Sequence, residues 1–82
     1  MTHHDALWAA IAVIARNNSK SASGLARACH LDATTFNPSK KYTVYGQARW
    51  ISTETLAKVL ISTNTSPMQF AEIFQKCLDM PE

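Results

Sequence analysis

Residues 22–36 read ASGLARACHLDATTF, and the spacing of apolar residues in this stretch indicates which fold to expect for the whole chain. Ala26, Leu31 and Phe36 follow one another at intervals of five residues. Two short helices that cross near a right angle need a small residue where they touch, an apolar residue just after the turn, and a large apolar anchor on the second helix. The spacing therefore predicts a helix-turn-helix over about residues 22–39. Its expected core is Leu25, Ala26, Cys29, Leu31 and Phe36.

The ends of the two helices in this unit are also marked in the sequence. Ser21 is suited to cap the first helix. His30 lies at a turn position that tends to need a positive φ, which His tolerates less well than Gly. The second helix should begin after Asp32 and should kink or end near Pro38, because proline lacks the N–H that a continuing helix would use.

Helical periodicity predicts three more helices outside this unit. Residues 5–17 repeat apolar side chains at helical spacing, and Asp5 can cap them. Ser52 caps a helix through about Thr63. Ser66 and Gln69 surround Pro67 as a capping box with proline at the first helical position, which starts a helix through about residue 78.

Residues 42–52 have no helical period and predict a long loop or a small hairpin between the third and fourth helices. We therefore expect an all-α fold, with a single domain over residues 1–82 built from five short helices.

The charge of the chain is unevenly distributed. The net charge is only +2, but residues 16–49 hold six cations against the single acid Asp32, a local charge of +5. A basic middle region favours a polyanionic partner, although interspersed charges on a solvated surface explain it equally well. No apolar run approaches the roughly 18 residues of a membrane span, and the N-terminus lacks the basic start of a signal peptide. A cytoplasmic location is therefore expected.

The cysteine and histidine content predicts neither a disulfide nor a metal site. Cys29 and Cys77 are the only cysteines and each falls in a helical pattern, so both are expected to be free buried thiols. His3, His4 and His30 do not form a standard zinc spacing with them. We expect no metal and no cofactor, and a frayed N-terminus around His3 and His4.

The run SASGLARACHLDATTF resembles the DNA-binding unit of lambda-type phage repressors, the xenobiotic-response-element-like helix-turn-helix family. With TTFNPSK and RWISTETLAKVL added, the chain is similar to the amino-terminal domain of LexA-like phage repressors over roughly residues 4–75. The resemblance implies a five-helix lambda-repressor-like domain. Longer relatives often carry a self-cleaving serine-lysine peptidase domain in addition. Nothing in this chain could be that domain, so it is expected to be a fragment or a short regulator without proteolytic activity.

On this reading the third helix enters the major groove of DNA. Thr34, Thr35 and Asn37 would then face base edges, because threonine methyls suit thymine and asparagine suits adenine. The alternative is that the threonines are solvated and that Asn37 simply ends the helix. The expected phosphate contacts are Ser21, Ser23, Lys40, Lys41, Arg49 and Lys20. The serines alternatively act as caps alone.

Two aromatic residues of the loop have different expected roles. Trp50 stands just before a helix and is expected to plug the core, whereas the role of Tyr45 stays open.

The function expected is sequence-specific binding of double-stranded DNA by a repressor, as a homodimer on a palindromic operator. Met68 and Ile73 would either help two copies to pair or pack inside the monomer. The alternative function is a helical protein-interaction module that kept the fold without binding DNA. An enzyme is not expected, because no nucleophile stands beside a positioned base.

Overall fold

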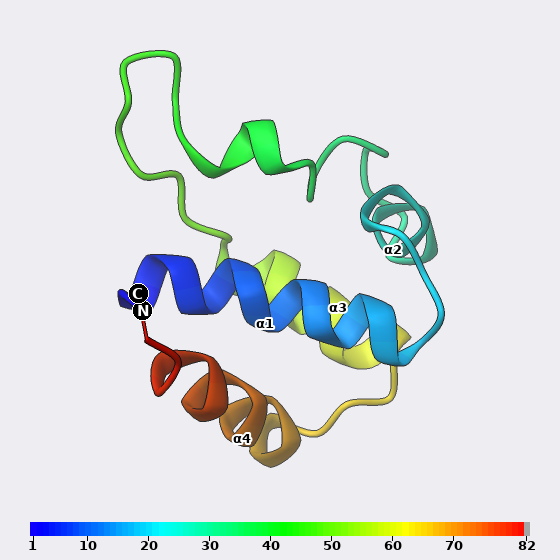
Figure 1. Ribbon diagram of the computed structural model, residues 1–82. Helices are drawn as coiled ribbons and strands as arrows, with labels where there is room; N and C mark the ends of the chain where they lie inside the picture. Colours follow the sequence, from blue (N-terminus) through cyan, green and yellow to red (C-terminus); the bar gives the residue numbers. More distant parts are fainter. Residues whose placement is uncertain (82) are drawn as a thin grey trace.

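The computed structural model describes residues 1–81, which form four α-helices and one 3₁₀ helix (Figure 1). The only pairing of extended backbone within these residues is an isolated antiparallel bridge between Tyr42 and Ala48. The all-α class is therefore confirmed, with four α-helices where five were expected. The elements are α1 (His3–Asn17), α2 (Ala22–Ala28), η1 (Pro38–Lys41), α3 (Thr53–Ser62) and α4 (Pro67–Leu78).

The segment expected to be the third helix is a turn followed by the 3₁₀ helix η1. The N–H of Thr35 donates to Asp32 O, and the N–H of Asn37 donates to Thr34 O, each at 3.0 Å. These bonds span three residues, as in a 3₁₀ helix, and not four. Pro38 explains the change, because its ring disfavours α geometry at the preceding residue, and Asn37 is extended with φ −62° and ψ 135°.

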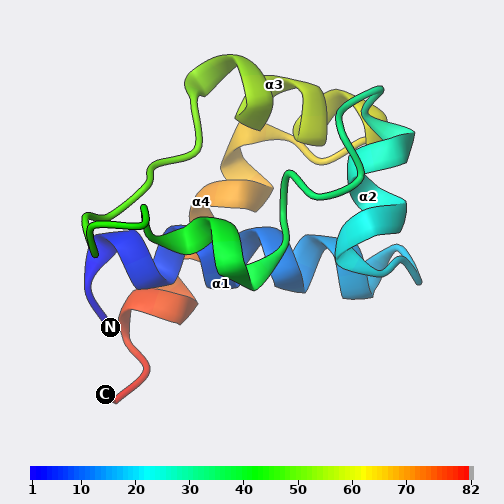
Figure 2. The ribbon, with the colours of Figure 1, turned by 90° about the horizontal axis from the view of Figure 1, so that it is seen from above.

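α1 is the central helix of the molecule. Figure 1 shows α4 along one side of it and the segment between α2 and α3 along the opposite side. In Figure 1 α3 passes behind α1, and Figure 2, seen from above, shows α3 lying to one side of α1. Every other α-helix can therefore bury its apolar face against α1 or against a neighbour of α1.

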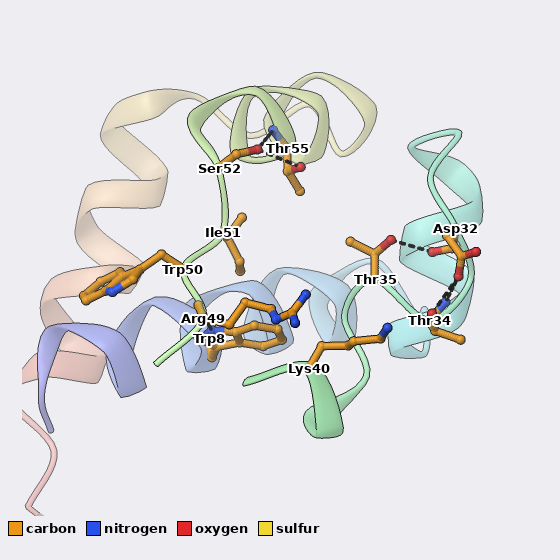
Figure 3. A pocket seen from close by; sticks show the side chains of 10 residues that line it. All are labelled: Trp8, Asp32, Thr34, Thr35, Lys40, Arg49, Trp50, Ile51, Ser52 and Thr55. Atoms are coloured by element: carbon orange, nitrogen blue, oxygen red, sulfur yellow. Dashed lines mark hydrogen bonds between the residues drawn. The ribbon is translucent and has the colours of Figure 1, made fainter. Parts of the chain in front are cut away.

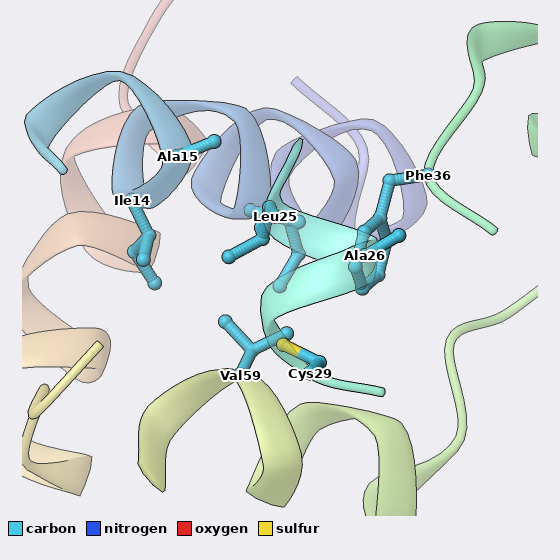
Figure 4. Packing of buried hydrophobic residues seen from close by; sticks show 8 residues of the cluster. Ile14, Ala15, Leu25, Ala26, Cys29, Phe36 and Val59 are labelled. Atoms are coloured by element: carbon cyan, nitrogen blue, oxygen red, sulfur yellow. The ribbon is translucent and has the colours of Figure 1, made fainter. Parts of the chain in front are cut away.

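The main core lies where α1, α2 and α3 meet (Figure 4). Leu25, Ala26 and Val59 are fully buried, and Cys29 and Phe36 are nearly so. The partly buried Leu31 packs against the same cluster, as do Leu56 and Leu60 of α3. Phe36 therefore anchors the turn after α2 to the core, although Phe36 does not lie in a helix. The buried members of this cluster are Ile11, Ile14, Ala15, Leu25, Ala26, Cys29, Phe36 and Val59.

A second, smaller core joins α1 to α4. Ala6 and Ala10 of α1 have no exposed surface and meet Cys77 of α4, whose thiol is free. Partly buried Phe70 and Ile73 pack against both cores. The small alanines let the two helix backbones approach closely. No helix within residues 1–81 is both long and apolar enough to cross a membrane.

The turn after α2 is closed by a left-handed residue, as its sequence predicted. His30 has φ +58°, the N–H of Leu31 donates to Ala26 O at 2.9 Å, and the N–H of His30 donates to Arg27 O at 3.0 Å. This pair of bonds is the Schellman motif, which commonly uses glycine at the left-handed position. α1 and α3 end in the same way at Ser19 and Asn64.

Serine and threonine cap the start of each α-helix. Ser21, Ser52 and Ser66 are the caps that the sequence predicted, and Ser66 forms the complete capping box with Gln69. The expected cap of α1 was wrong, because Thr2 caps the helix and accepts the N–H of Asp5 at 3.1 Å.

The N-terminus is tied to the end of the chain. The ammonium group of Met1 donates to Leu78 O at 3.2 Å and to Met80 O at 2.9 Å. The expected frayed N-terminus was wrong for this reason.

Candidate nucleic-acid interface

An open depression of about 400 Å³ lies between the turn after α2, the end of the loop and the first turn of α3 (Figure 3). Figure 3 shows Thr35, Lys40 and Arg49 reaching toward this space from opposite sides. The start of α3 contributes Ser52 and Thr55 to its wall. Because a helix N-terminus carries a partial positive charge, this wall favours an anion, as the two cations do. The lining residues are Trp8, Asp32, Thr34, Thr35, Lys40, Arg49, Trp50, Ile51, Ser52 and Thr55.

Two of the three residues predicted to read bases lie on this depression. Thr34 is exposed and Thr35 is half-buried, so neither is turned into the core. The Thr34 hydroxyl donates to the Asp32 carboxylate at 2.6 Å, and the Thr35 hydroxyl donates to Asp32 O at 2.7 Å. Each hydroxyl therefore already donates its hydrogen bond within the protein. Both oxygens can still accept a hydrogen bond from a base, and both methyl groups remain available for apolar contact.

The carboxylate of Asp32 is stabilised in its charged form by this turn. The side-chain hydroxyl of Thr34 is the largest cause that lowers the pKa of Asp32, followed by the Thr34 N–H, which donates to the carboxylate at 2.8 Å. Lys40 lowers the pKa of Asp32 further through its charge. The depression therefore holds one fixed negative charge beside its cations.

Asn37, the third predicted base contact, lies between the turn and η1. Its side-chain oxygen accepts the N–H of Ser39 at 3.2 Å and so caps η1, and its side chain is exposed. The oxygen keeps a second lone pair, and its amide nitrogen has no partner within residues 1–81. A paired donor and acceptor, as adenine requires, therefore remains at this position.

The predicted phosphate-binding cations differ in their surroundings. Lys41 forms an ion pair with Asp5 at 2.6 Å, which is the largest cause of the lowered pKa of that carboxyl group. Within residues 1–81, Lys40 and Arg49 have no carboxylate within 4 Å of their charged atoms. Lys41 therefore ties η1 to α1, whereas Lys40 and Arg49 remain the cations of the depression.

The backbone at Arg49 is held firmly by α1. The indole N–H of Trp8 donates to Arg49 O at 3.0 Å, and Nε2 of His4 lies 3.1 Å from the same oxygen. A carbonyl oxygen only accepts, so His4 carries its proton on Nε2. The N–H of Arg49 in turn donates to Lys41 O at 2.9 Å. Arg49 is thus held by α1 through its carbonyl oxygen and by Lys41 through its N–H, and these bonds fix the base of the loop between η1 and α3.

The other predicted phosphate contacts lie elsewhere, at the junction of α1 and α2. Ser21 caps α2 and accepts the N–H of Gly24 at 3.1 Å, and its hydroxyl oxygen lies 3.3 Å from that of Ser23. The exposed Lys20 lines a separate, mostly apolar cavity of about 120 Å³ beside Phe36. The structure therefore separates the predicted phosphate contacts into the two cations of the depression, Lys41 against α1, and the group at the junction of α1 and α2.

Two tryptophans lie at or near the depression. Trp50 does not plug the core, because 58% of it is exposed and its ring packs edge-on against His4 at a centroid distance of 5.2 Å. Trp8 of α1 also lines the depression, although the sequence did not identify it as a site residue. Sequence periodicity could not have placed Trp8 there, because the bond from its indole spans 41 positions of the chain.

No group of three metal-binding side chains occurs in the part of the chain that the structure describes. Comparisons with protein-family models, curated proteins and solved structures gave no match for this chain.

Proposed function

We propose that this chain is the sequence-specific DNA-binding domain of a lambda-repressor-like transcriptional regulator. The proposal rests on the depression beside the start of α3, which is lined by Lys40, Arg49 and the threonine-rich turn. Among the residues that the structure describes, the two cations there have no carboxylate within 4 Å, and the turn offers methyl groups and hydrogen-bonding atoms. Such a surface can contact both the phosphate backbone and the base edges of DNA.

In this proposal the turn and η1 take the place that the resemblance gives to a recognition helix. Thr34, Thr35 and Asn37 contact base edges, and Lys40 and Arg49 contact the phosphates alongside. Asp32 is ionised at neutral pH and its carboxylate is held by hydrogen bonds from Thr34, so it repels misplaced phosphates and favours one orientation on the duplex. Repression follows from occupancy, because a bound protein excludes polymerase from the operator.

Salt dependence of binding tests the proposal most directly. We expect the chain to bind a mixed-sequence duplex of about 30 base pairs, three helical turns, with log affinity falling linearly with log salt. Each neutralised phosphate contributes a slope of about −0.9, so Lys40→Ala should make the slope about one unit shallower. The matched control is Lys76→Ala on α4, a lysine of the opposite side of α1, which should leave both affinity and slope unchanged. Fluorescence anisotropy between about 50 and 200 mM salt measures both.

Sequence selectivity needs a second measurement. On duplexes selected from a random pool, Asn37→Ala should relax the preference at one base pair, whereas Lys40→Ala should weaken binding to all sequences alike. Absence of measurable duplex binding at low salt contradicts the proposal. It would favour a protein-interaction module, for which the missing third α-helix is the supporting observation.

A further inference from the structure

The loop between η1 and α3 is a small hairpin with a rigid base and an exposed apolar tip. Tyr42 and Ala48 form its antiparallel bridge, and the N–H of Thr43 donates to Gln47 O at 2.8 Å. Gly46, with φ +79°, allows the chain to reverse. At the tip Val44 is 94% exposed and Tyr45 is 88% exposed. Two neighbouring apolar side chains are thus presented to solvent by a hairpin whose base is held by α1.

The packing of the hairpin indicates that its tip is not needed for the fold. Neither Val44 nor Tyr45 contributes to either hydrophobic cluster. The base is instead fixed through Arg49 O, which accepts from Trp8 and His4, and through the ion pair of Lys41 with Asp5. A rigid support reduces the entropy that the tip would lose on binding a partner. The arrangement favours contact with a macromolecule. The charges around the hairpin indicate what kind of macromolecule this is.

The charge around the hairpin favours a polyanion. Residues 33–53 contain Lys40, Lys41 and Arg49 and no acidic residue. Lys41 is neutralised by Asp5, and Lys40 and Arg49 lie in the depression near the base of the hairpin. In Figure 1 the hairpin, η1 and the turn after α2 all lie on the side of α1 opposite α4. A duplex bound at the threonine-rich turn would therefore also face the hairpin.

We propose that the hairpin tip contacts the minor groove of DNA next to the major groove that the turn occupies. This inference rests on the proposed function. The molecule is 31 Å in its longest dimension, and adjacent grooves lie about half a helical turn, roughly 17 Å, apart. Apolar side chains insert between base steps in minor-groove binding proteins. The Tyr45 hydroxyl can donate to the acceptors that A·T pairs present there.

The test compares Tyr45→Ala and Tyr45→Phe with the unchanged chain on the same mixed-sequence duplex. Tyr45→Ala should weaken binding about tenfold, as expected for loss of one aromatic contact with a base, while Tyr45→Phe keeps most of the affinity. The slope of log affinity against log salt should not change, because no phosphate contact is lost. The matched control is Ile61→Ala on α3, which removes an apolar side chain of similar exposure, 80%, and should have no effect.

A second arm tests the groove. When the minor groove is filled with netropsin, the unchanged chain and Tyr45→Ala should bind with equal affinity. If the unchanged chain keeps its tenfold advantage on the filled duplex, the assignment to the minor groove is wrong. If Tyr45→Ala binds like the unchanged chain while Lys40→Ala binds weakly, DNA binding stands and the hairpin proposal falls. If the unchanged chain does not bind DNA at low salt, both proposals fall.

Discussion

The polar side chains of the turn after α2 form hydrogen bonds to residues two or three positions away in the sequence. Asp32 shows this most clearly, because Thr34 donates to its carboxylate from both the hydroxyl and the backbone while Thr35 donates to its carbonyl. The sequence suggested that these threonines point outward. It could not reveal that their protons are already used, because that depends on the turn being 3₁₀-like. A base partner would therefore meet acceptors and methyl groups at these two positions.

The lowered pKa of Asp32 provides a test of this turn. Carboxyl titration by NMR should place the pKa of Asp32 below the ordinary value of about 3.9. Thr34→Val removes the hydroxyl donor and should raise the pKa toward that value. Thr35→Val is the matched control, because its hydroxyl bonds to the backbone oxygen, and it should leave the pKa unchanged. An equal shift in both variants would contradict the assigned geometry.

The same shift fixes the sign of a pH effect on stability. Because the folded-state pKa of Asp32 is lowered, its contribution to the free energy of unfolding is present above the ordinary pKa. That contribution is lost as the pH falls through the folded value. In Thr34→Val the loss of this contribution on acidification should therefore be smaller.

At the scale of elements, the sequence predicted four helices well and one badly. The helices that were predicted well combine a cap with apolar periodicity, as Ser52 and Val59 do in α3. The failed helix had Asp32 as a cap and Phe36 as an anchor, but its length was limited by Pro38. The hydrogen bonds from Thr34 and Thr35 to Asp32 compete with the backbone hydrogen bonds of an α-helix, and no sequence pattern predicts which of the two sets forms.

The site was only partly predictable for a related reason. Thr34, Thr35, Lys40 and Arg49 were all identified from the sequence and share one depression. The exclusion of Lys41 from that depression depends on its ion pair with Asp5, which lies 36 positions earlier in the sequence. Contacts of this range are set by the packing of η1 against α1 and leave no local signal.

The most extensive packing between elements lies between α1 and α4, and we expect it to be sensitive to added volume. Ala10 has no exposed surface and lies in the cluster with Ala6 and Cys77. Ala10→Val should lower the free energy of unfolding by about 1–3 kcal/mol beyond its control, because the interface has no room for two methyl groups. The control is Ala12→Val in the same helix, which is exposed and carries the same cost in helix propensity. Urea unfolding measures both, and equal losses would show that the interface tolerates the larger side chain.

At the scale of the whole molecule, the candidate DNA-binding features lie on the side of α1 that faces away from α4. The depression and the hairpin lie on one side of α1, and α4 lies on the other (Figure 1). On α4, Met68 is 78% exposed, but Ile73 packs against both cores. Of the two residues considered for pairing of copies, only Met68 is therefore available at the surface. A single exposed apolar residue is ordinary on a monomer.

We therefore expect the free chain to be a monomer that pairs only on DNA. Sedimentation velocity at tens of micromolar should give a mass near 9.1 kDa. A duplex with two selected half-sites one helical turn apart, about 34 Å, should bind two copies cooperatively, because the duplex holds both copies at a high effective concentration and a weak contact between them then becomes favourable. A duplex with the half-sites shifted by half a turn is the control and should bind two copies independently. A stable dimer without DNA that Met68→Ala dissociates would show instead that α4 is a permanent interface.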